Sequence, residues 1–198
     1  MLFRSNLKID TAKEICGVLC LSAIKEASQV GLYCFSDQKE LYLKPETGMK
    51  QAYSIISKIF RLVPKSLKTN IEDGISFALN ILKRKSVVIL ISDFLDKNYL
   101  HNLKALARKH DLVVIHIYDK REVNLPNLGI VPVFDKETLK TMWINTSSYL
   151  FKREMKDVFE ENQSFLEKLC KQQKASYIAI ESGSDYVSSL IQLFRFRK

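Results

Sequence analysis

The sequence predicts a three-layer α/β domain with a mostly parallel sheet, and two apolar runs are the main reason. Residues 86–92 are a continuous run of branched apolar side chains, which is typical of a strand covered on both faces, and residues 112–118 form a second buried strand. A helical pattern over residues 98–109 lies between them. Strand, helix and strand in this order form a βαβ unit, which implies parallel strands joined by a right-handed crossover.

The elements before this unit follow from periodicity and capping residues. Residues 10–27 form a helix, and its inward face is expected to hold Ile15, Val18, Leu19, Ser22 and Ala23. Short apolar runs at 32–35 and 40–43, joined by a polar turn, form an antiparallel hairpin. A helix over 49–62 ends before Pro64. The next helix begins after the capping residues Thr69 and Asn70 and reaches residue 83.

The elements after this unit complete one domain over residues 1–198. Residues 129–134 form a strand that Pro132 confines to an edge, and residues 141–144 pair with it. A long amphipathic helix covers 149–173, followed by a strand over 176–180 and a helix over 185–196. The inward face of the long helix is expected to hold Phe151, Met155, Val158, Phe159, Phe165, Leu166 and Leu169.

Composition excludes several classes of protein. The chain has 198 residues, 46% of them hydrophobic, which excludes a disordered or fibrous protein. The net charge of +9 is spread evenly, apart from short clusters at 83–85 and 195–198, so a nucleic-acid interface is disfavoured. No apolar run approaches the roughly 20 residues of a bilayer helix, and the first residues do not resemble a signal peptide. We therefore expect a cytoplasmic protein without a membrane span.

The cysteines and histidines are expected to be core residues. Cys16, Cys20, Cys34 and Cys170 form no CxxC pair, so reduced thiols packed in the core are favoured. Cys16 and Cys20 share a helical face, which leaves a metal or redox pair open as the alternative. His116 lies inside a buried strand and is expected to be a hydrogen-bonded core residue. His110 is expected to end a helix.

The candidate functional residues follow the predicted parallel strands, because ligands of such sheets bind beyond the carboxyl ends of the strands. Asp93 and Asp96 follow one strand, and Asp119 and Arg121 follow the next. Neither a glycine-rich phosphate loop nor a GxSxG nucleophile motif is present. Thr69 and Asp93 carry oxygen ligands of the kind that Mg²⁺ accepts, but two ligands are too few. The alternative is that both residues cap helices or turns.

Two long segments carry a resemblance to a known family. KTNIEDGISFALNILKRKSVVILISDFLD and VVIHIYDKREVNLPNLGIV resemble the bacterial domain-of-unknown-function family fifty-eight, and the resemblance extends over essentially the whole chain. That family is similar to the von Willebrand factor A domain, whose fold is a doubly wound, Rossmann-type sheet. Its members are commonly encoded beside MoxR-type AAA+ ATPases. The resemblance assigns Thr69 and Asp93 to the second and third loops of a metal-ion-dependent adhesion site.

The first loop of that site, a DxSxS motif after the central first strand, is absent from this sequence. The chain begins with Met1-Leu2-Phe3-Arg4-Ser5, which resembles the residues that follow the motif, with Arg4 in place of a glycine. We therefore expect an N-terminally truncated domain that lacks its central strand. The half-sheets would rejoin, borrow a strand or pack poorly. Mg²⁺, which the resemblance implies for the full-length family, is not expected to bind strongly to this chain.

The leading functional hypothesis is a non-enzymatic protein-interaction module. The resemblance implies a MoxR-type ATPase as partner, in a chaperone or assembly role, with other von Willebrand A-like proteins as further candidates. The partner face would surround Thr69 and Asp93. It would include Asn70, Asp96, Asp119 and Arg121. The alternative is a metal-dependent phosphoester hydrolase that uses the strand-end carboxylates of Asp93, Asp96 and Asp119.

Overall fold

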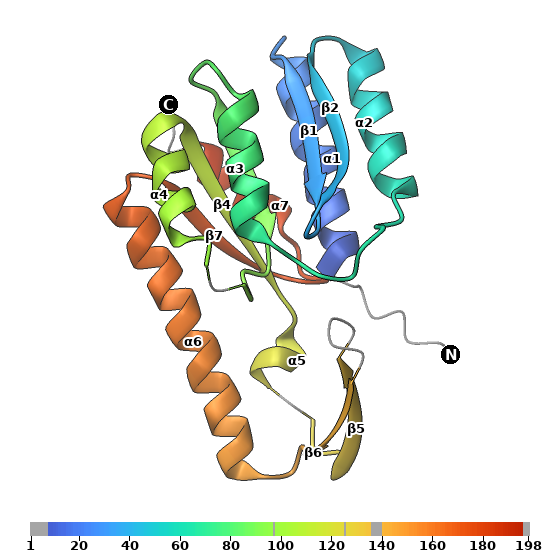
Figure 1. The fold of residues 1–198 in the computed structure, drawn as a ribbon, viewed down its shortest axis with the longest axis vertical. Coiled ribbons are helices and arrows are strands. Elements are labelled where there is room, and N and C mark those ends of the chain that lie inside the picture. Colours follow the sequence, from blue (N-terminus) through green and yellow to red (C-terminus); the bar gives the residue numbers. More distant parts are fainter. Residues whose placement is uncertain (1–7, 97, 125, 136–139, 196–198) are drawn as a thin grey trace. The chain divides into compact units, whose positions relative to one another are not determined.

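The computed structural model describes residues 8–96, 98–124, 126–135 and 140–195 of the chain. These residues divide into two compact units, each built from two stretches of chain. The helical unit, as we name it, holds residues 8–86 and 94–110, and the sheet unit holds residues 87–93 and 111–195. Figure 1 labels the elements of both. The expected single domain over residues 1–198 stays a prediction.

The described residues of the helical unit form four helices and one antiparallel hairpin, as the sequence predicts. The helices are α1 (Lys8–Lys25), α2 (Met49–Arg61), α3 (Ile71–Ile81) and α4 (Leu100–Lys109). The hairpin is formed by β1 (Val30–Phe35) and β2 (Lys39–Glu46), with Tyr33 opposite Tyr42. His110 is the C-terminal cap residue of α4, as predicted, and its buried ring has a pKa lowered by desolvation and by Lys109.

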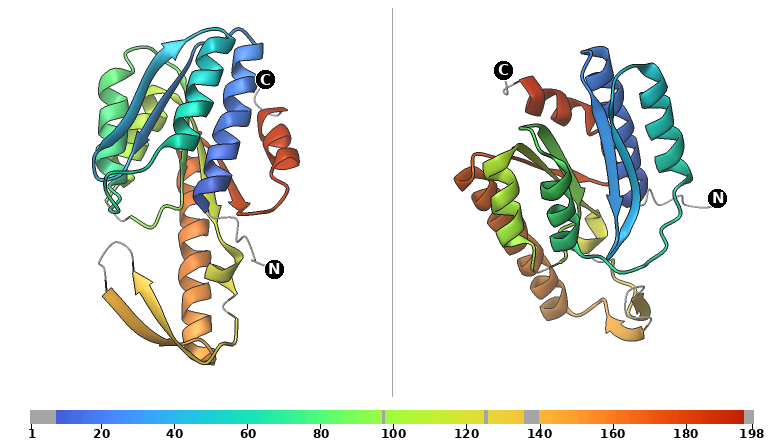
Figure 2. Two further views of the ribbon diagram at one scale, coloured as in Figure 1. Left: turned by 90° about the vertical axis from the view of Figure 1, so that its right-hand side faces the viewer. Right: turned by 45° about the horizontal axis from the view of Figure 1, so that its top comes forward.

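Helices cover both faces of the β1–β2 hairpin (Figures 1 and 2). On one face, Leu32 packs against a core made by α1 and α2. The buried members of that core are Cys20, Ile24, Ala52 and Ile55. On the other face, the Tyr33 ring stacks on Phe77 of α3 with 4.5 Å between the centroids. Gly74 lets α3 approach closely, because a Cβ atom there would lie 2.5 Å from the Phe35 ring.

The sheet unit is built on three parallel strands in the order β3 (Val87–Ser92), β4 (Asp111–Tyr118) and β7 (Ser176–Glu181). The parallel α/β class predicted from the sequence is therefore confirmed. The unit also contains α5 (Lys120–Val123), α6 (Tyr149–Gln172) and α7 (Val187–Arg195). β4 is the central strand, and its residues 112–117 are all buried.

β3 is less covered than its sequence suggests. Its apolar run predicts burial on both faces, yet Val87 is exposed and only Leu90 is fully buried. The physical reason is its place at the edge of the three-stranded sheet. Among the described residues, β1–β2 and β3–β4–β7 are separate sheets.

One face of this sheet carries an aromatic and polar cluster beneath α6. The Nδ1 atom of His116 lies 2.9 Å from the hydroxyl of Tyr177, so His116 is the hydrogen-bonded core residue that the sequence predicts. Phe159 of α6 packs on this pair from above, with 5.9 Å between its ring and that of His116. The neighbouring Tyr118 ring also contacts Phe159, at 5.1 Å.

A second hairpin projects from the sheet unit. β5 (Ile130–Asp135) pairs in antiparallel register with β6 (Lys140–Asn145), which confirms the predicted pairing of these two segments. The buried Thr146, which lies between β6 and α6, bonds to the loop before β5 and so closes the base of the hairpin. The hydroxyl of Thr146 accepts the Leu128 N–H at 2.9 Å and donates to the Gly129 carbonyl at 2.9 Å.

Two helices bury only part of the predicted set of side chains. In α1, Ile15 is buried as predicted, but Val18 is exposed, and Cys20 and Ile24 are buried although they were not predicted to be. α1 is apolar on more than one face, so periodicity alone does not select the stripe that meets α2. In α6, Val158 and Phe165 are exposed, whereas Leu166 is fully buried.

The length of α6 explains the second error. Its 24 residues span about 36 Å at 1.5 Å per residue, whereas a strand of six residues covers about 20 Å. Its three buried residues, Leu166, Leu169 and Cys170, all lie near its C-terminus, and the N-terminal part extends beyond the strands (Figure 1). Neither α6 nor any other helix of the described residues is long and apolar enough to cross a membrane.

Candidate functional site at the strand ends

The predicted site residues fall into both units. Thr69, Asn70 and Asp96 belong to the helical unit. Asp93 directly follows β3 and belongs to the sheet unit. Asp119 and Arg121 belong to the same unit. The two candidate Mg²⁺ ligands, Thr69 and Asp93, are therefore in different units. Their joint action on a metal ion stays a prediction.

Asn70 and Asp96 meet at the N-terminus of α3. The Asn70 side chain accepts the Asp73 N–H at 3.0 Å, which makes Asn70 the N-cap that the sequence predicts. The Asp96 carboxylate accepts the Ile71 N–H at 2.8 Å, although 25 residues separate the two in sequence. Helix N-termini leave such N–H groups without partners in the helix, and carboxylates there are stabilised by the helix dipole. Asp96 therefore fixes the loop after β3 onto α3.

A backbone turn brings Asp96 into this position. Phe94, directly after Asp93, is fully buried and has a φ of 52°, in the left-handed region that residues other than glycine rarely adopt. Its ring packs against Tyr99 at 5.6 Å. The burial of Phe94 offsets the cost of that conformation. The loop thus holds a strained residue between its two aspartates, which is a feature often found at functional sites.

Glu40 is a structural acid that the sequence reasoning missed. Its carboxylate accepts hydrogen bonds from the Ser36 hydroxyl at 2.7 Å and from the backbone N–H groups of Lys65 and Ser66 at 3.0 and 3.2 Å. These bonds lower the pKa of Glu40, the Ser36 bond most strongly. They hold the segment between α2 and α3, which carries the exposed Thr69, against the β1–β2 turn. No local pattern indicates a contact across 25 residues.

Asp119 and Arg121 form a closed pair at the end of β4. Asp119 is the N-cap of α5 in a capping box with Glu122, and it accepts the Arg121 N–H at 2.8 Å. The guanidinium also donates to Asp119 from Nε at 3.0 Å and from Nη2 at 2.7 Å. This pairing raises the pKa of Arg121 further. Both predicted partner-face residues are thus held in place, with Arg121 largely exposed.

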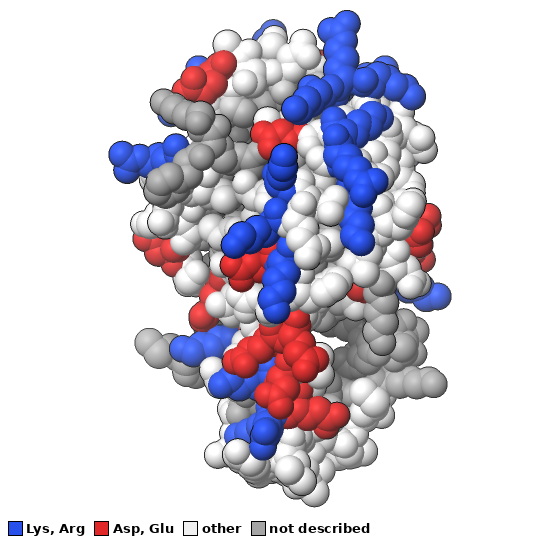
Figure 3. Space-filling view, turned by 90° about the vertical axis from the view of Figure 1, so that its left-hand side faces the viewer, with Lys and Arg blue, Asp and Glu red and all other residues white. Residues whose placement is uncertain are grey.

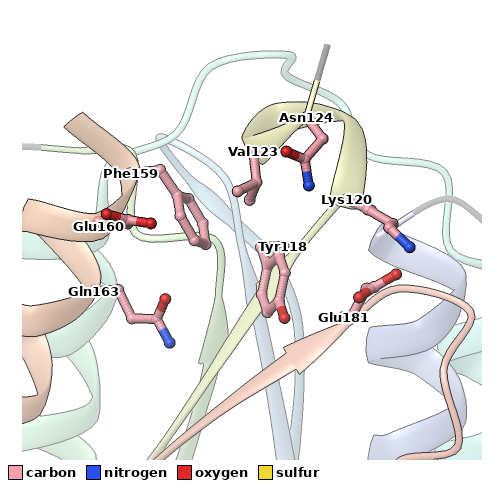
Figure 4. Close-up of a pocket in the computed structure, with 8 residues that line it drawn as sticks. All are labelled: Tyr118, Lys120, Val123, Asn124, Phe159, Glu160, Gln163 and Glu181. Atoms are coloured by element: carbon pink, nitrogen blue, oxygen red, sulfur yellow. The ribbon is translucent and has the colours of Figure 1, made fainter. Parts of the chain in front are cut away.

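A cleft opens beside this pair, at the carboxyl ends of β4 and β7 (Figure 4). Tyr118 and Glu181, the last residues of the two strands, are paired in register and form its floor. Its volume is about 250 Å³. Around the floor lie side chains from α5, from its C-cap residue and from α6, namely Lys120, Val123, Asn124, Phe159, Glu160 and Gln163.

The cleft combines an aromatic wall with charged and amide groups. Burial, and to a smaller degree the charge of Glu181, raises the pKa of Tyr118. Figure 3 shows a group of acidic side chains on this side of the molecule. Asp157, Glu160 and Glu161 of α6 are exposed. The sequence reasoning stopped at the first two parallel strands. Applied to the third strand, the same strand-end rule finds Glu181.

Burial keeps the cysteine thiols in the protonated form. Burial raises the pKa of Cys16 to about 12, and the pKa values of Cys34 and Cys170 to about 11. All four thiols are free; Cys20 and Cys170 are buried, as predicted for core residues, and Cys16 and Cys34 are partly buried. Within the described ranges, no group of three or more His, Cys, Asp or Glu residues could hold a metal ion.

Comparisons with known proteins agree with the α/β fold. "Uncharacterized protein Rv1480" of Mycobacterium tuberculosis is 27% identical over 95 residues, which cover 46% of this chain and only 30% of that relative. "Uncharacterized protein MAV169" of Mycobacterium avium is 23% identical over 121 residues, or 59% of this chain and 69% of that protein. The conserved hypothetical protein BatB from Bacteroides thetaiotaomicron has a similar fold. Its TM-score is 0.56 at 13% identity, over 95% of this chain and 87% of that one.

The matched stretch thus spans less than a third of the length of the M. tuberculosis relative. Residues 2–164 match the family described as protein of unknown function DUF58, and this match includes β3, β4 and the segment between them that carries Asp93 and Asp96. By this match, the chain belongs to the DUF58 family of proteins of unknown function.

Proposed function

We propose that the protein is a non-enzymatic protein-interaction module. The observation that carries this proposal is that two of the strand-end carboxylates already accept hydrogen bonds within the protein. Asp96 accepts a backbone N–H of α3, and Asp119 accepts a backbone N–H of α5 and pairs with Arg121. Carboxylates held by such bonds stabilise loops and present a fixed surface. A general base, in contrast, must reach a substrate proton.

The contact surface in this proposal is the cleft of Tyr118 and Glu181 with the neighbouring Arg121. Its aromatic wall of Tyr118 and Phe159 suits the apolar stem of a partner side chain. Its carboxylates, Glu160 and Glu181, suit a basic end group. Buried aromatic anchors surrounded by charged groups are typical of the residues that dominate protein interfaces.

The partner we propose is a MoxR-type AAA+ ATPase, and the proposed setting is the cytoplasm. This part rests on the family resemblance, as does the proposal of a doubly wound, von Willebrand factor A-like fold. Other von Willebrand A-like proteins are the further candidates. The partner face extends in this proposal to Asn70 and Asp96, with Thr69 and Asp93 as partial Mg²⁺ ligands completed by further groups.

A binding assay with a MoxR-type ATPase from the same organism tests the proposal. Glu181→Lys reverses the charge at the cleft floor, and we expect an affinity at least about tenfold lower, the size of one strong interface residue. Glu167→Lys is the matched control, because Glu167 is exposed on α6 but does not line the cleft. Equal affinity of wild type and Glu181→Lys rejects the cleft as the contact surface.

The metal part is tested separately. If Mg²⁺ contributes, EDTA and the variants Thr69→Ala and Asp93→Ala weaken binding to the same degree. Unchanged binding in EDTA rejects the metal and leaves the cleft standing. The hydrolase alternative makes a different prediction: turnover of p-nitrophenyl phosphate with Mg²⁺, lost in Asp93→Ala.

A further inference from the structure

The β5–β6 hairpin exposes apolar side chains on both of its faces. Ile130 is 67% exposed and Trp143 is 72% exposed on one face, and Met142 is 54% exposed on the other. A two-stranded hairpin is marginally stable in water unless a further strand or surface covers it. Clustered exposed apolar side chains typically mark an interface. This hairpin therefore has the features of a docking element.

The base of the hairpin is held firmly. Thr146 is buried, and both its backbone and its side chain bond to the loop before β5, with Thr146 N–H donating to Gly129 O at 2.8 Å. Lys152 of α6 donates to the side chain of Asn127 in the same loop. A docking element on a fixed base loses little conformational freedom when it binds.

The pattern of hydrogen-bonded and non-hydrogen-bonded pairs in the β5–β6 ladder decides which edge of the hairpin can accept another strand. The bond from Thr146 to Gly129 makes these two residues a hydrogen-bonded pair. Pairs alternate in an antiparallel ladder, so the Pro132–Trp143 pair is a non-hydrogen-bonded one. The nitrogen of Pro132 therefore points away from β6, where β5 offers no donor. On β6, the N–H and C=O groups of Thr141 and Trp143 point outward, so β6 is the edge that can pair.

The composition of the turn argues against a lipid surface as the occupant. A hairpin that inserts into a bilayer needs apolar residues at its tip. The sequence from Asp135, the last residue of β5, to Lys140, the first residue of β6, reads DKETLK, and four of its six residues are charged. The exposed apolar side chains belong to the strands themselves. A protein strand that covers the edge and both faces fits this distribution better.

β6 is complementary to itself. When two copies run antiparallel about a two-fold axis at Trp143, the outward groups of each Trp143 face those of the other. Thr141 then lies opposite Asn145 of the second copy, and Met142 opposite Ile144. This register opposes no like charges over residues 141–145 and stacks apolar side chains on both faces. We propose that the protein forms a two-fold dimer through β6, as a four-stranded antiparallel sheet.

The single tryptophan of the chain makes this proposal directly measurable. Trp143 is the only Trp among the 198 residues, so its emission reports on β6 alone. We expect light scattering to show a rise from 22.9 kDa to twice that mass as the protein is concentrated from about 1 to about 200 µM. The emission maximum is expected to shift to shorter wavelength over the same range, because the indole leaves water.

Two test variants and two controls distinguish strand pairing at the β6 edge from non-specific hydrophobic association. Thr141→Pro removes an outward donor that the β5–β6 ladder does not use, and Thr141→Val keeps that donor. Trp143→Lys sets two like charges opposite each other across the axis. Both Thr141→Pro and Trp143→Lys are expected to weaken the dimer at least about tenfold, whereas Thr141→Val is not. Tyr53→Lys on α2, which replaces another exposed aromatic residue, serves as the second control.

Several results would overturn the proposal. A monomer with unshifted emission up to about 200 µM excludes the dimer over this range. A dimer that survives Thr141→Pro and Trp143→Lys uses another surface. An emission shift caused by phosphatidylglycerol vesicles, without self-association, assigns the hairpin to lipid. Circular dichroism of each variant, together with the retained mass of Thr141→Val, separates a lost interface from a lost fold.

Discussion

The described part of the chain contains two antiparallel hairpins of similar length in different surroundings. In the helical unit, β1–β2 has Leu32 packed against α1 and α2 on one face and Tyr33 stacked on α3 on the other. In the sheet unit, β5–β6 leaves Met142 and Trp143 exposed. Both pairings are predictable from local sequence, because turn residues and alternation specify a hairpin. Whether other elements cover a hairpin depends on tertiary structure, not on local sequence. That coverage distinguishes the core hairpin β1–β2 from the exposed hairpin β5–β6.

The largest expected change in the free energy of unfolding comes from creating a cavity in the core that packs against β1–β2. Ile55 is fully buried among α1, α2 and the hairpin, so Ile55→Ala is expected to lower the free energy of unfolding by about 2–5 kcal/mol. The matched change on the other hairpin, Met142→Ala, should stay within about 0.5 kcal/mol in dilute protein. Urea unfolding of both variants measures this difference, and equal losses would contradict the contrast between the hairpins.

Gly74→Ala tests the close approach of α3 to β1–β2. Alanine favours a helix by about 1 kcal/mol over glycine, but its Cβ atom would lie 2.5 Å from the Phe35 ring. Overpacking of this kind costs about 1–3 kcal/mol, so we expect a net loss of about 1 kcal/mol. Gly17→Ala is the control, since its nearest neighbour would be 3.7 Å away, and it should stabilise α1. A Gly74→Ala protein as stable as Gly17→Ala would contradict the packing.

Thr146→Val tests the anchored base of β5–β6. The substitution removes the hydroxyl that joins Leu128 and Gly129. The Leu128 N–H loses its acceptor, while the Gly129 carbonyl keeps the bond from the Thr146 N–H, so we expect a cost of about 1 kcal/mol. The loss should be local. We expect faster amide hydrogen exchange in β5 and β6 and unchanged exchange in β4. Uniform acceleration would show that the hairpin unfolds together with the sheet.

The smallest expected effect is the acid sensitivity conferred by Glu40. Its pKa is lowered from 4.5 by the bonds that tie the segment after α2 to the β1–β2 turn. A lowered carboxyl pKa contributes stability above pH 4.5, and that contribution is lost as the pH falls through the folded-state pKa. Glu40→Gln should therefore flatten the decline of the unfolding midpoint below pH 4.5, whereas the exposed control Glu161→Gln should not. Parallel curves for wild type and Glu40→Gln would contradict this role.

The sequence predicts the elements well because their signals are local. The Asn70 cap, the parallel β3–β4 pair and the buried His116 all follow from periodicity and from capping chemistry over a few residues. The buried faces of α1 and α6 do not follow. In α1 the apolar residues lie on more than one face, and α6 is longer than the strands it covers.

The candidate site is only partly predictable for the same reason. Asp96 and Asp119 were found by the strand-end rule, but their bonds to the starts of α3 and α5 depend on tertiary structure. The cleft was missed because its floor joins Tyr118 to Glu181, which are adjacent only through the β4–β7 register. Glu40 was missed because its partners lie 25 residues further along the chain.

Amide hydrogen exchange at two protein concentrations tests most directly whether β5–β6 is a docking element and β1–β2 a core element. The outward N–H groups of Thr141 and Trp143 should exchange rapidly at about 1 µM and slowly at about 200 µM, while β1 shows the same protection at both. Equal exchange of Thr141 and Trp143 at the two concentrations, fast or slow, would contradict the account.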